Sequence, residues 1–124
     1  MMVSYDTTKG GDYWMASPDA IRKILRDMRA AIDSGKFHPI SRDKNRRTLA
    51  LLGITWADAK DEIYSLTEHD YYSGPMLDYA DFSSDHFWEF KKSIDGHIIY
   101  IKFKVMYQED GRVKVVGFHI DGMR

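Results

Sequence analysis

Four residues in the last third of the chain have side chains suited to cleaving RNA without a metal ion: Glu89, Tyr100, Lys102 and His119. Such cleavage requires a base for the 2′-hydroxyl, a cation for the charge on the phosphorane, and an acid for the departing 5′-oxygen. Glu89 and His119 could share the proton transfers, because histidine titrates near neutral pH. Lys102 could hold the phosphate, and Tyr100 could hydrogen-bond to it or stack on a base.

Three β-strands are predicted to position these residues. The first covers residues 86–94, the second 97–107 and the third 112–121. Asp95-Gly96 is a strong two-residue hairpin signal between the first two strands, and Asp110-Gly111 marks the turn before the third. The pattern therefore predicts a three-stranded antiparallel meander.

Side chains alternate across a strand, so each predicted strand has two faces. The apolar faces are predicted to hold Trp88, Phe90, Ile99, Ile101, Phe103, Val105, Tyr107, Val116, Phe118 and Ile120. The opposite faces would hold Glu89, Lys91, Tyr100, Lys102, Lys104 and His119, together with Val115 and Gly117. If the apolar faces all lie against helices, the polar residues form one outer surface, where Lys91 or Lys104 could help Lys102 to hold a phosphate. A solvated sheet face with cross-strand ion pairs would have a similar composition.

Three helices are predicted before the strands. The first begins at Ser17-Pro18-Asp19, where a capping hydroxyl and a proline suit a helix N-terminus, and it ends before Gly35. The second is predicted over 42–52. The third runs from Thr55 to about Thr67, and a loop is expected over 74–85.

The second predicted helix begins with a cluster of cations at Arg42, Lys44, Arg46 and Arg47. The helix dipole disfavours positive charge at this end. Such a charge run is usually a solvated helix face, but it could also contribute to nucleic-acid binding. The sequence leaves both interpretations open.

The order of elements predicts an α+β fold in which N-terminal helices pack on one side of a three-stranded antiparallel meander sheet. A single domain would cover residues 17–124, and residues 1–16 are expected to form a flexible N-terminal extension. A chain of 124 residues is long enough to bury a core without disulfides or metals.

Composition excludes several classes of site. The chain contains no cysteine, which removes disulfides, thiolate metal sites and a cysteine nucleophile. Its five histidines show no metal-ligand spacing, so we expect neither a metal nor another cofactor.

No apolar run is long enough to span a membrane and no secretory leader is evident, which predicts a cytoplasmic protein without a membrane partner. The net charge of −1 argues against non-specific coating of nucleic acid, although it is compatible with a local basic face.

Four segments, in order, carry a resemblance to a known family: LTEHDYYSGP at 66–75, HFWEF at 86–90, GHIIYIKFKV at 96–105 and VVGFHI at 115–120. They resemble the MqsR family of toxin–antitoxin systems, whose toxins are messenger-RNA endoribonucleases with a RelE-like fold. The corresponding family segments are Leu-Ser/Thr-x-x-Asp-Phe/Tyr-Tyr, a strand with tryptophan, a Tyr-x-Lys strand and a closing Ser-Phe-Lys/His strand. With the predicted helices, the resemblance covers about 18–121.

The resemblance implies roles for individual residues. Glu89 takes the family's active-site position after the tryptophan, Tyr100 matches the strand tyrosine, and His119 replaces a lysine on the last strand. Tyr72 and Ser73 are implied as substrate-binding residues, with Ser73 where the family has a lysine. The chain therefore resembles a variant of the family with a His/Glu pair.

The same resemblance implies a function: a type II toxin that cleaves messenger RNA without a metal and is inhibited by a cognate antitoxin with a DNA-binding domain. Two alternatives use the same sheet face. One is an RNA-binding module without catalysis, and the other is a protein-interaction domain whose outer sheet docks a partner.

Overall fold

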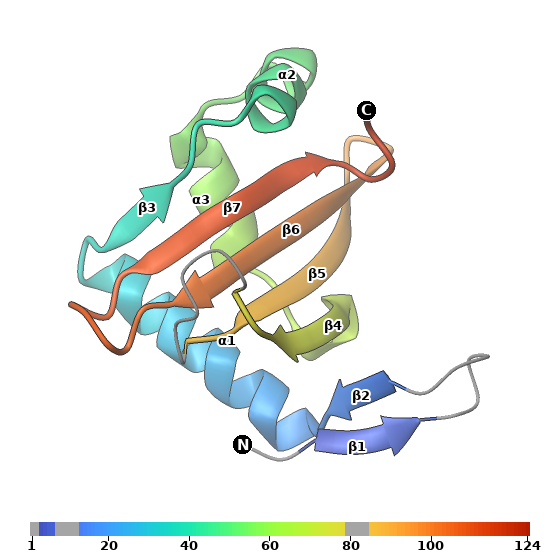
Figure 1. Ribbon diagram of the computed structural model, residues 1–124. Helices are drawn as coiled ribbons and strands as arrows, with labels where there is room; N and C mark the ends of the chain where they lie inside the picture. The colour runs from blue at the N-terminus through green and yellow to red at the C-terminus, as the bar shows by residue number, and fades with distance from the viewer. Residues whose placement is uncertain (1–2, 7–12, 79–84) are drawn as a thin grey trace.

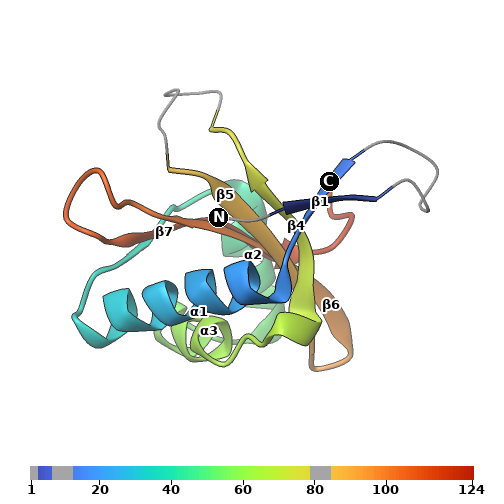
Figure 2. The ribbon, with the colours of Figure 1, turned by 90° about the horizontal axis from the view of Figure 1, so that it is seen from below.

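The computed structural model describes residues 3–6, 13–78 and 85–124, and shows a twisted sheet with helices against one face (Figures 1 and 2). The strands lie in the order β1-β2-β4-β5-β6-β7-β3. Their bounds are β1 Val3–Asp6, β2 Tyr13–Ala16, β3 Phe37–Pro39, β4 Tyr71–Met76, β5 Phe87–Ile94, β6 His97–Val105 and β7 Val113–Ile120. The helices are α1 Pro18–Asp33, α2 Asp43–Leu52 and α3 Trp56–Tyr64, followed by the short 3₁₀-helix η1 Glu68–Asp70.

The three-stranded sheet predicted from the sequence is wrong. Strands β5, β6 and β7 do form an antiparallel meander, but the sheet is mixed and has seven strands. β4 pairs antiparallel with β5, and β3 pairs parallel with β7. Both added strands contain a proline; β3 has only three residues and β4 lacks regular alternation, so periodicity does not reveal them. Part of the predicted 74–85 loop therefore belongs to β4.

The first sixteen residues supply two further strands. β1 pairs antiparallel with β2, and β2 joins β4 through a parallel pairing of Met15 with Gly74. Residues 1–2 and 7–12, which fall in the predicted N-terminal extension, lie outside the described residues.

The helix ends follow the local signals in the sequence. The Ser17 side chain accepts a hydrogen bond from the Ala20 N–H at 3.2 Å, as expected for the predicted N-cap of α1. Thr55 and Asp58 form the predicted capping box of α3. α3 ends at Tyr64, slightly before the predicted Thr67. None of the described helices is long and apolar enough to cross a membrane.

The core lies between the sheet and the helices α1 and α3. Ile99, Ile101 and Phe103 of β6 are fully buried, as the alternation of β6 predicts. The rings of Phe90 and Phe103 stack with their centroids 5.5 Å apart. Tyr107 was predicted to share this apolar face, but it lies beyond the end of β6 and is 48% exposed.

A β-bulge in β7 changes which residues face the core. Lys102 of β6 lies opposite Gly117, whereas Phe103 lies opposite Val115, so Val116 is an extra residue in β7. Val115 therefore belongs to the core, and Val116 lines a pocket on the other face. The sequence prediction placed these two valines the other way round, because strict alternation takes no account of a bulge.

Candidate active site

Cross-strand pairing brings the four predicted catalytic residues together on the face of the sheet opposite α1 and α3. Glu89 of β5 lies opposite Lys102 of β6 in the strand register, and Tyr100 of β6 lies opposite His119 of β7. The Tyr100 hydroxyl donates a hydrogen bond to the Glu89 carboxylate. The Tyr100 and His119 rings lie 5.1 Å apart. The four side chains thus occupy two adjacent rows of one sheet surface.

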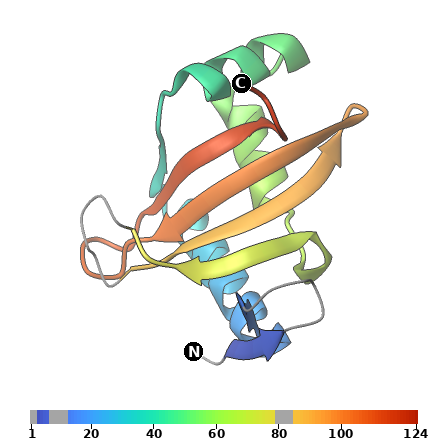
Figure 3. The same ribbon diagram turned by 45° about the vertical axis from the view of Figure 1, so that its right-hand side comes forward.

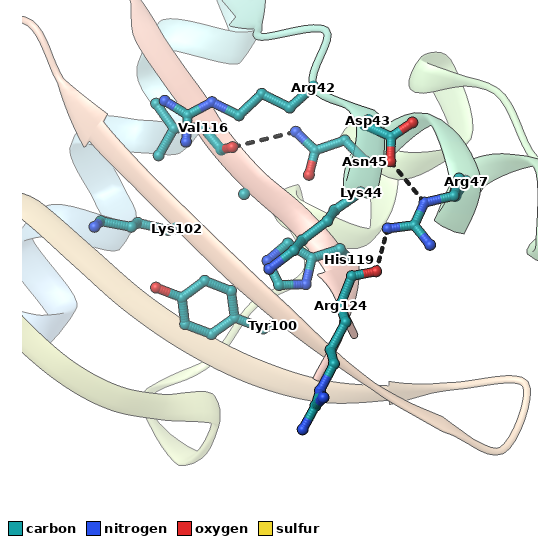
Figure 4. Close-up of a pocket in the computed structure, with 11 residues that line it drawn as sticks. Arg42, Asp43, Lys44, Asn45, Arg47, Tyr100, Lys102, Val116, His119 and Arg124 are labelled. Carbon is teal, nitrogen blue, oxygen red and sulfur yellow. Dashed lines mark hydrogen bonds and ion pairs between the residues drawn. The ribbon is translucent and has the colours of Figure 1, made fainter. Parts of the chain in front are cut away.

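This surface forms one wall of a pocket of about 480 Å³, and α2 forms the other (Figure 4). The volume falls within the usual range of small-ligand sites, roughly 300–1,000 Å³. The pocket is lined by Arg42, Asp43, Lys44, Asn45, Arg47, Tyr100, Lys102, Val116, Gly117, His119 and Arg124. Glu89 is not among the lining residues and lies behind Tyr100 as its hydrogen-bond acceptor.

The pocket is strongly cationic although the whole chain has a net charge of −1. Five lysine and arginine side chains line it, and Asp43 has the one acidic side chain among the described lining residues. Asp43 is itself paired with Arg47 at 2.8 Å. The remaining positive charge faces a shared space, which is the arrangement that binds phosphate groups.

Buried polar side chains of α2 fix the helix against β7. Asn45 donates to the backbone oxygens of Ile40 (3.0 Å) and Val116 (3.2 Å) and accepts from the Phe118 N–H (2.9 Å). Thr48, one turn further along α2, accepts from a backbone N–H of β7, that of Ile120, at 3.1 Å. Where the short β3 ends, α2 therefore takes the place of a neighbouring strand, as Figure 3 shows beside β7.

This docking places the cationic end of α2 over the sheet, which the sequence did not reveal. The N-cap residue Arg42 has no side-chain capping bond, and it lines the pocket together with Lys44 and Arg47. A bound anion would offset the unfavourable position of these cations at the helix N-terminus. The sequence feature that could have indicated this docking is the presence of Asn45 and Thr48 on the apolar side of α2. Small polar side chains on such a face suggest hydrogen bonds to a neighbouring element.

Tyr100 is held in its protonated form. Burial raises the pKa of its hydroxyl, and the hydrogen bond to the Glu89 carboxylate raises this pKa further. At neutral pH the phenol therefore keeps its proton and acts as a hydrogen-bond donor.

His119 is oriented by the backbone of its own strand. Its Nδ1 lies 3.0 Å from the Ile120 carbonyl oxygen. A carbonyl oxygen can only accept a hydrogen bond, which assigns the proton of the neutral ring to Nδ1. Nε2 is then left as a proton acceptor.

Lys102 lies in the centre of the polar surface. Its Nζ is 4.8 Å from the centre of the Phe87 ring. Among the described residues no carboxylate forms an ion pair with it, so its charge is available to a ligand.

The residues predicted to bind substrate divide into two groups. Lys91 pairs with Asp121 at 3.0 Å and lies 3.9 Å from the centre of the Tyr72 ring, next to Tyr100. Tyr72 of β4 is 54% exposed, and Ser73 of β4 lies opposite Glu89 of β5. These residues extend the polar surface beyond the pocket.

Lys104 does not join this surface. It is fully buried, and its Nζ pairs with Asp78 at 2.8 Å and lies 5.1 Å from the Phe87 ring centre. Asp78, which follows β4, covers this end of the sheet, so Lys104 lies in the interior rather than on the predicted outer face.

The chain matches no protein-family model, and no curated protein shows significant similarity to it. Within residues 3–6, 13–78 and 85–124, no group of three His, Asp or Glu side chains could hold a metal ion.

Proposed function

We propose that this protein is a metal-independent endoribonuclease and that the pocket between α2 and the outer sheet face is its active site. The observation that carries this proposal is the convergence of Lys102, His119 and a protonated Tyr100 in one cationic pocket. These groups are the cation, base and acid that cleavage at a 2′-hydroxyl requires.

In the proposed reaction His119 Nε2 accepts the proton of the 2′-hydroxyl. The 2′-oxygen then forms a bond to phosphorus, while Lys102 stabilises the charge on the phosphate oxygens. As the bond from phosphorus to the 5′-oxygen breaks, the Tyr100 O–H turns from Glu89 to that oxygen and protonates it, and the phenolate that remains is a weaker base than an alkoxide. The products are a 2′,3′-cyclic phosphate and a 5′-hydroxyl, and solvent returns the proton from His119 to Tyr100.

Glu89 acts through Tyr100 in this scheme. It accepts the Tyr100 hydrogen bond before the reaction and keeps the phenol protonated. This role differs from the one expected from the sequence, which was direct participation of Glu89 in proton transfer.

We further propose that the substrate is messenger RNA in the cytoplasm and that the protein is a type II toxin, inhibited by a cognate antitoxin with a DNA-binding domain. The support is the resemblance to the MqsR family. Its last three segments fall on β5, β6 and β7, and its first includes most of β4, which lies next to β5. An adjacent gene for a small helix-turn-helix protein would agree with this proposal.

The test is induced expression of the intact chain beside His119→Ala, following growth and total messenger RNA. We expect growth arrest with fragmented transcripts for the intact chain, and relief of both by His119→Ala, because the substitution removes the base. Normal growth with intact transcripts, at confirmed soluble expression, would contradict the proposal. It would favour a non-catalytic RNA-binding or protein-interaction domain.

Gly117 provides a second test at the floor of the pocket. A Cβ at this position would lie 3.2 Å from Tyr100 Cε2 and 3.3 Å from Lys102 Cβ. Gly117→Ala should therefore displace both side chains by a few tenths of an ångström. We expect about a tenfold loss of RNA cleavage, since misplacement by about 1 Å can cost about a hundredfold. Thermal unfolding should show a loss of stability no larger than about 1–2 kcal/mol. Unchanged cleavage by a folded variant would separate Gly117 from the active site.

A further inference from the structure

The pocket has a second group of cations that the proposed reaction does not use. Arg42, the N-cap residue of α2, and Lys44 in its first turn lie on the wall of the pocket that faces the sheet (Figure 4). Within the described residues neither side chain forms a hydrogen bond or an ion pair. Arg47 differs, because it is engaged by Asp43 and by the backbone oxygen of Arg124. Arg42 and Lys44 are thus two exposed cations facing a space that already contains Lys102.

The opposite end of the same surface offers a flat aromatic group. From β7 to β4 the polar row runs through His119, Tyr100 and Lys91 and reaches Tyr72, which is 54% exposed. Three strand spacings separate β7 from β4, which is roughly 14 Å. The Lys91 ammonium lies over one face of the Tyr72 ring, so a base would stack on the opposite face. Aromatic rings with cations nearby are surfaces on which unpaired bases stack.

We propose that the pocket binds single-stranded RNA across the strands, from α2 to β4, with subsites on both sides of the scissile phosphate. Arg42 and Lys44 hold the neighbouring phosphate, and Tyr72 stacks on a base at the far end. This inference rests on the proposed function, because the scissile phosphate defines the centre of the path. Double-stranded RNA should lack the Tyr72 contact, since its paired bases cannot stack on the ring.

The test compares two substrates that share one cleavage step. The first is a single-stranded RNA of about eight nucleotides containing a step that the wild-type protein cleaves, and the second is the dinucleoside monophosphate of that step. For the double variant Arg42→Ala/Lys44→Ala, kcat/KM should fall at least tenfold more for the longer RNA than for the dinucleoside monophosphate. Equal losses on both substrates, or no loss on either, would overturn the subsite.

The chain offers a matched control on the same helix. Arg46 is exposed, hydrogen-bonds to Ser41 and does not line the pocket. Arg46→Ala also removes a positive charge from α2. It should leave unchanged the ratio of kcat/KM for the longer RNA to kcat/KM for the dinucleoside monophosphate. Tyr72→Ala should lower this ratio and Tyr72→Phe should restore it, because stacking needs the ring and not the hydroxyl. A ratio that Arg46→Ala lowers as much as Arg42→Ala/Lys44→Ala would indicate general charge attraction and overturn the proposal.

A binding measurement separates this inference from the proposed function. RNA of the same length with 2′-O-methyl groups cannot be cleaved, so its affinity is independent of catalysis. The slope of log affinity against log salt should become shallower by about 0.7 for each phosphate that Arg42→Ala/Lys44→Ala no longer neutralises. If the wild-type protein cleaves neither substrate, the proposed function fails, and the slope alone decides the subsite. A shallower slope would support it, and an unchanged slope would overturn it.

Discussion

Replacing Lys102 by alanine should lower the rate of RNA cleavage by about a hundredfold to a thousandfold, which is the usual cost of removing one group that stabilises transition-state charge. The same substitution should change the free energy of unfolding by no more than about 1 kcal/mol. Lys102 has no ion-pair partner among the described residues, and its ammonium lies beside Phe87 rather than in a hydrogen-bond network. A large loss of activity with little loss of stability is therefore expected at this position.

Two companion variants make the result for Lys102 specific. Lys114 of β7 lies opposite Lys104 of β6 in the strand register and does not line the pocket. Lys114→Ala removes the same charge from the same sheet and should leave cleavage within about twofold of wild type, because Lys114 does not line the pocket and salt screens the fields of exposed charges. Lys102→Arg keeps the charge and should recover part of the activity. Initial rates on a labelled single-stranded RNA, with denaturant unfolding of each variant, provide the measurement. Full activity of Lys102→Ala would remove this residue from the mechanism.

The grouping of these residues was predictable because it depends on local patterns. The hairpin signal at Asp95-Gly96 is present in the structure, where the strands pair Ile94 with His97. With the turn and the strand period known, Glu89, Tyr100 and Lys102 must share a face. The helix caps also depend on neighbouring residues alone, and they too are confirmed.

Features that depend on distant contacts were not predictable in this way. The bulge at Val116 is held partly by Asn45, which is 71 residues away in the sequence. Lys104 is buried because Asp78 pairs with it, although its strand position alone suggests an exposed lysine. The three-residue strand β3 is defined by its pairing with β7, which is distant in the sequence. For the same reason the cations of α2 and the residues of the sheet could be recognised separately but not as parts of one pocket.

Asn45 links the fold to the pocket, and Asn45→Ala should reduce the free energy of unfolding by about 2–4 kcal/mol. The side chain is fully buried and makes three hydrogen bonds to backbone groups. Its removal would deprive the Phe118 N–H and the Val116 carbonyl of this partner inside the protein, where water does not compensate for it. These two groups flank Gly117, so the bulge and the direction of His119 should change as well.

Denaturant unfolding of Asn45→Ala beside Lys44→Ala tests this role of Asn45. Lys44 is the preceding residue on α2 and is exposed, so its substitution should change stability by no more than about 0.5 kcal/mol. Without denaturant, at a temperature where Asn45→Ala is still folded, its RNA cleavage should remain below that of the wild type, because α2 no longer fixes β7. If the free energy of unfolding of Asn45→Ala fell by less than about 0.5 kcal/mol, the hydrogen bonds could not be what holds the helix in place. The cationic wall of the pocket would then depend on apolar packing at Leu49, which is buried on the same side of α2.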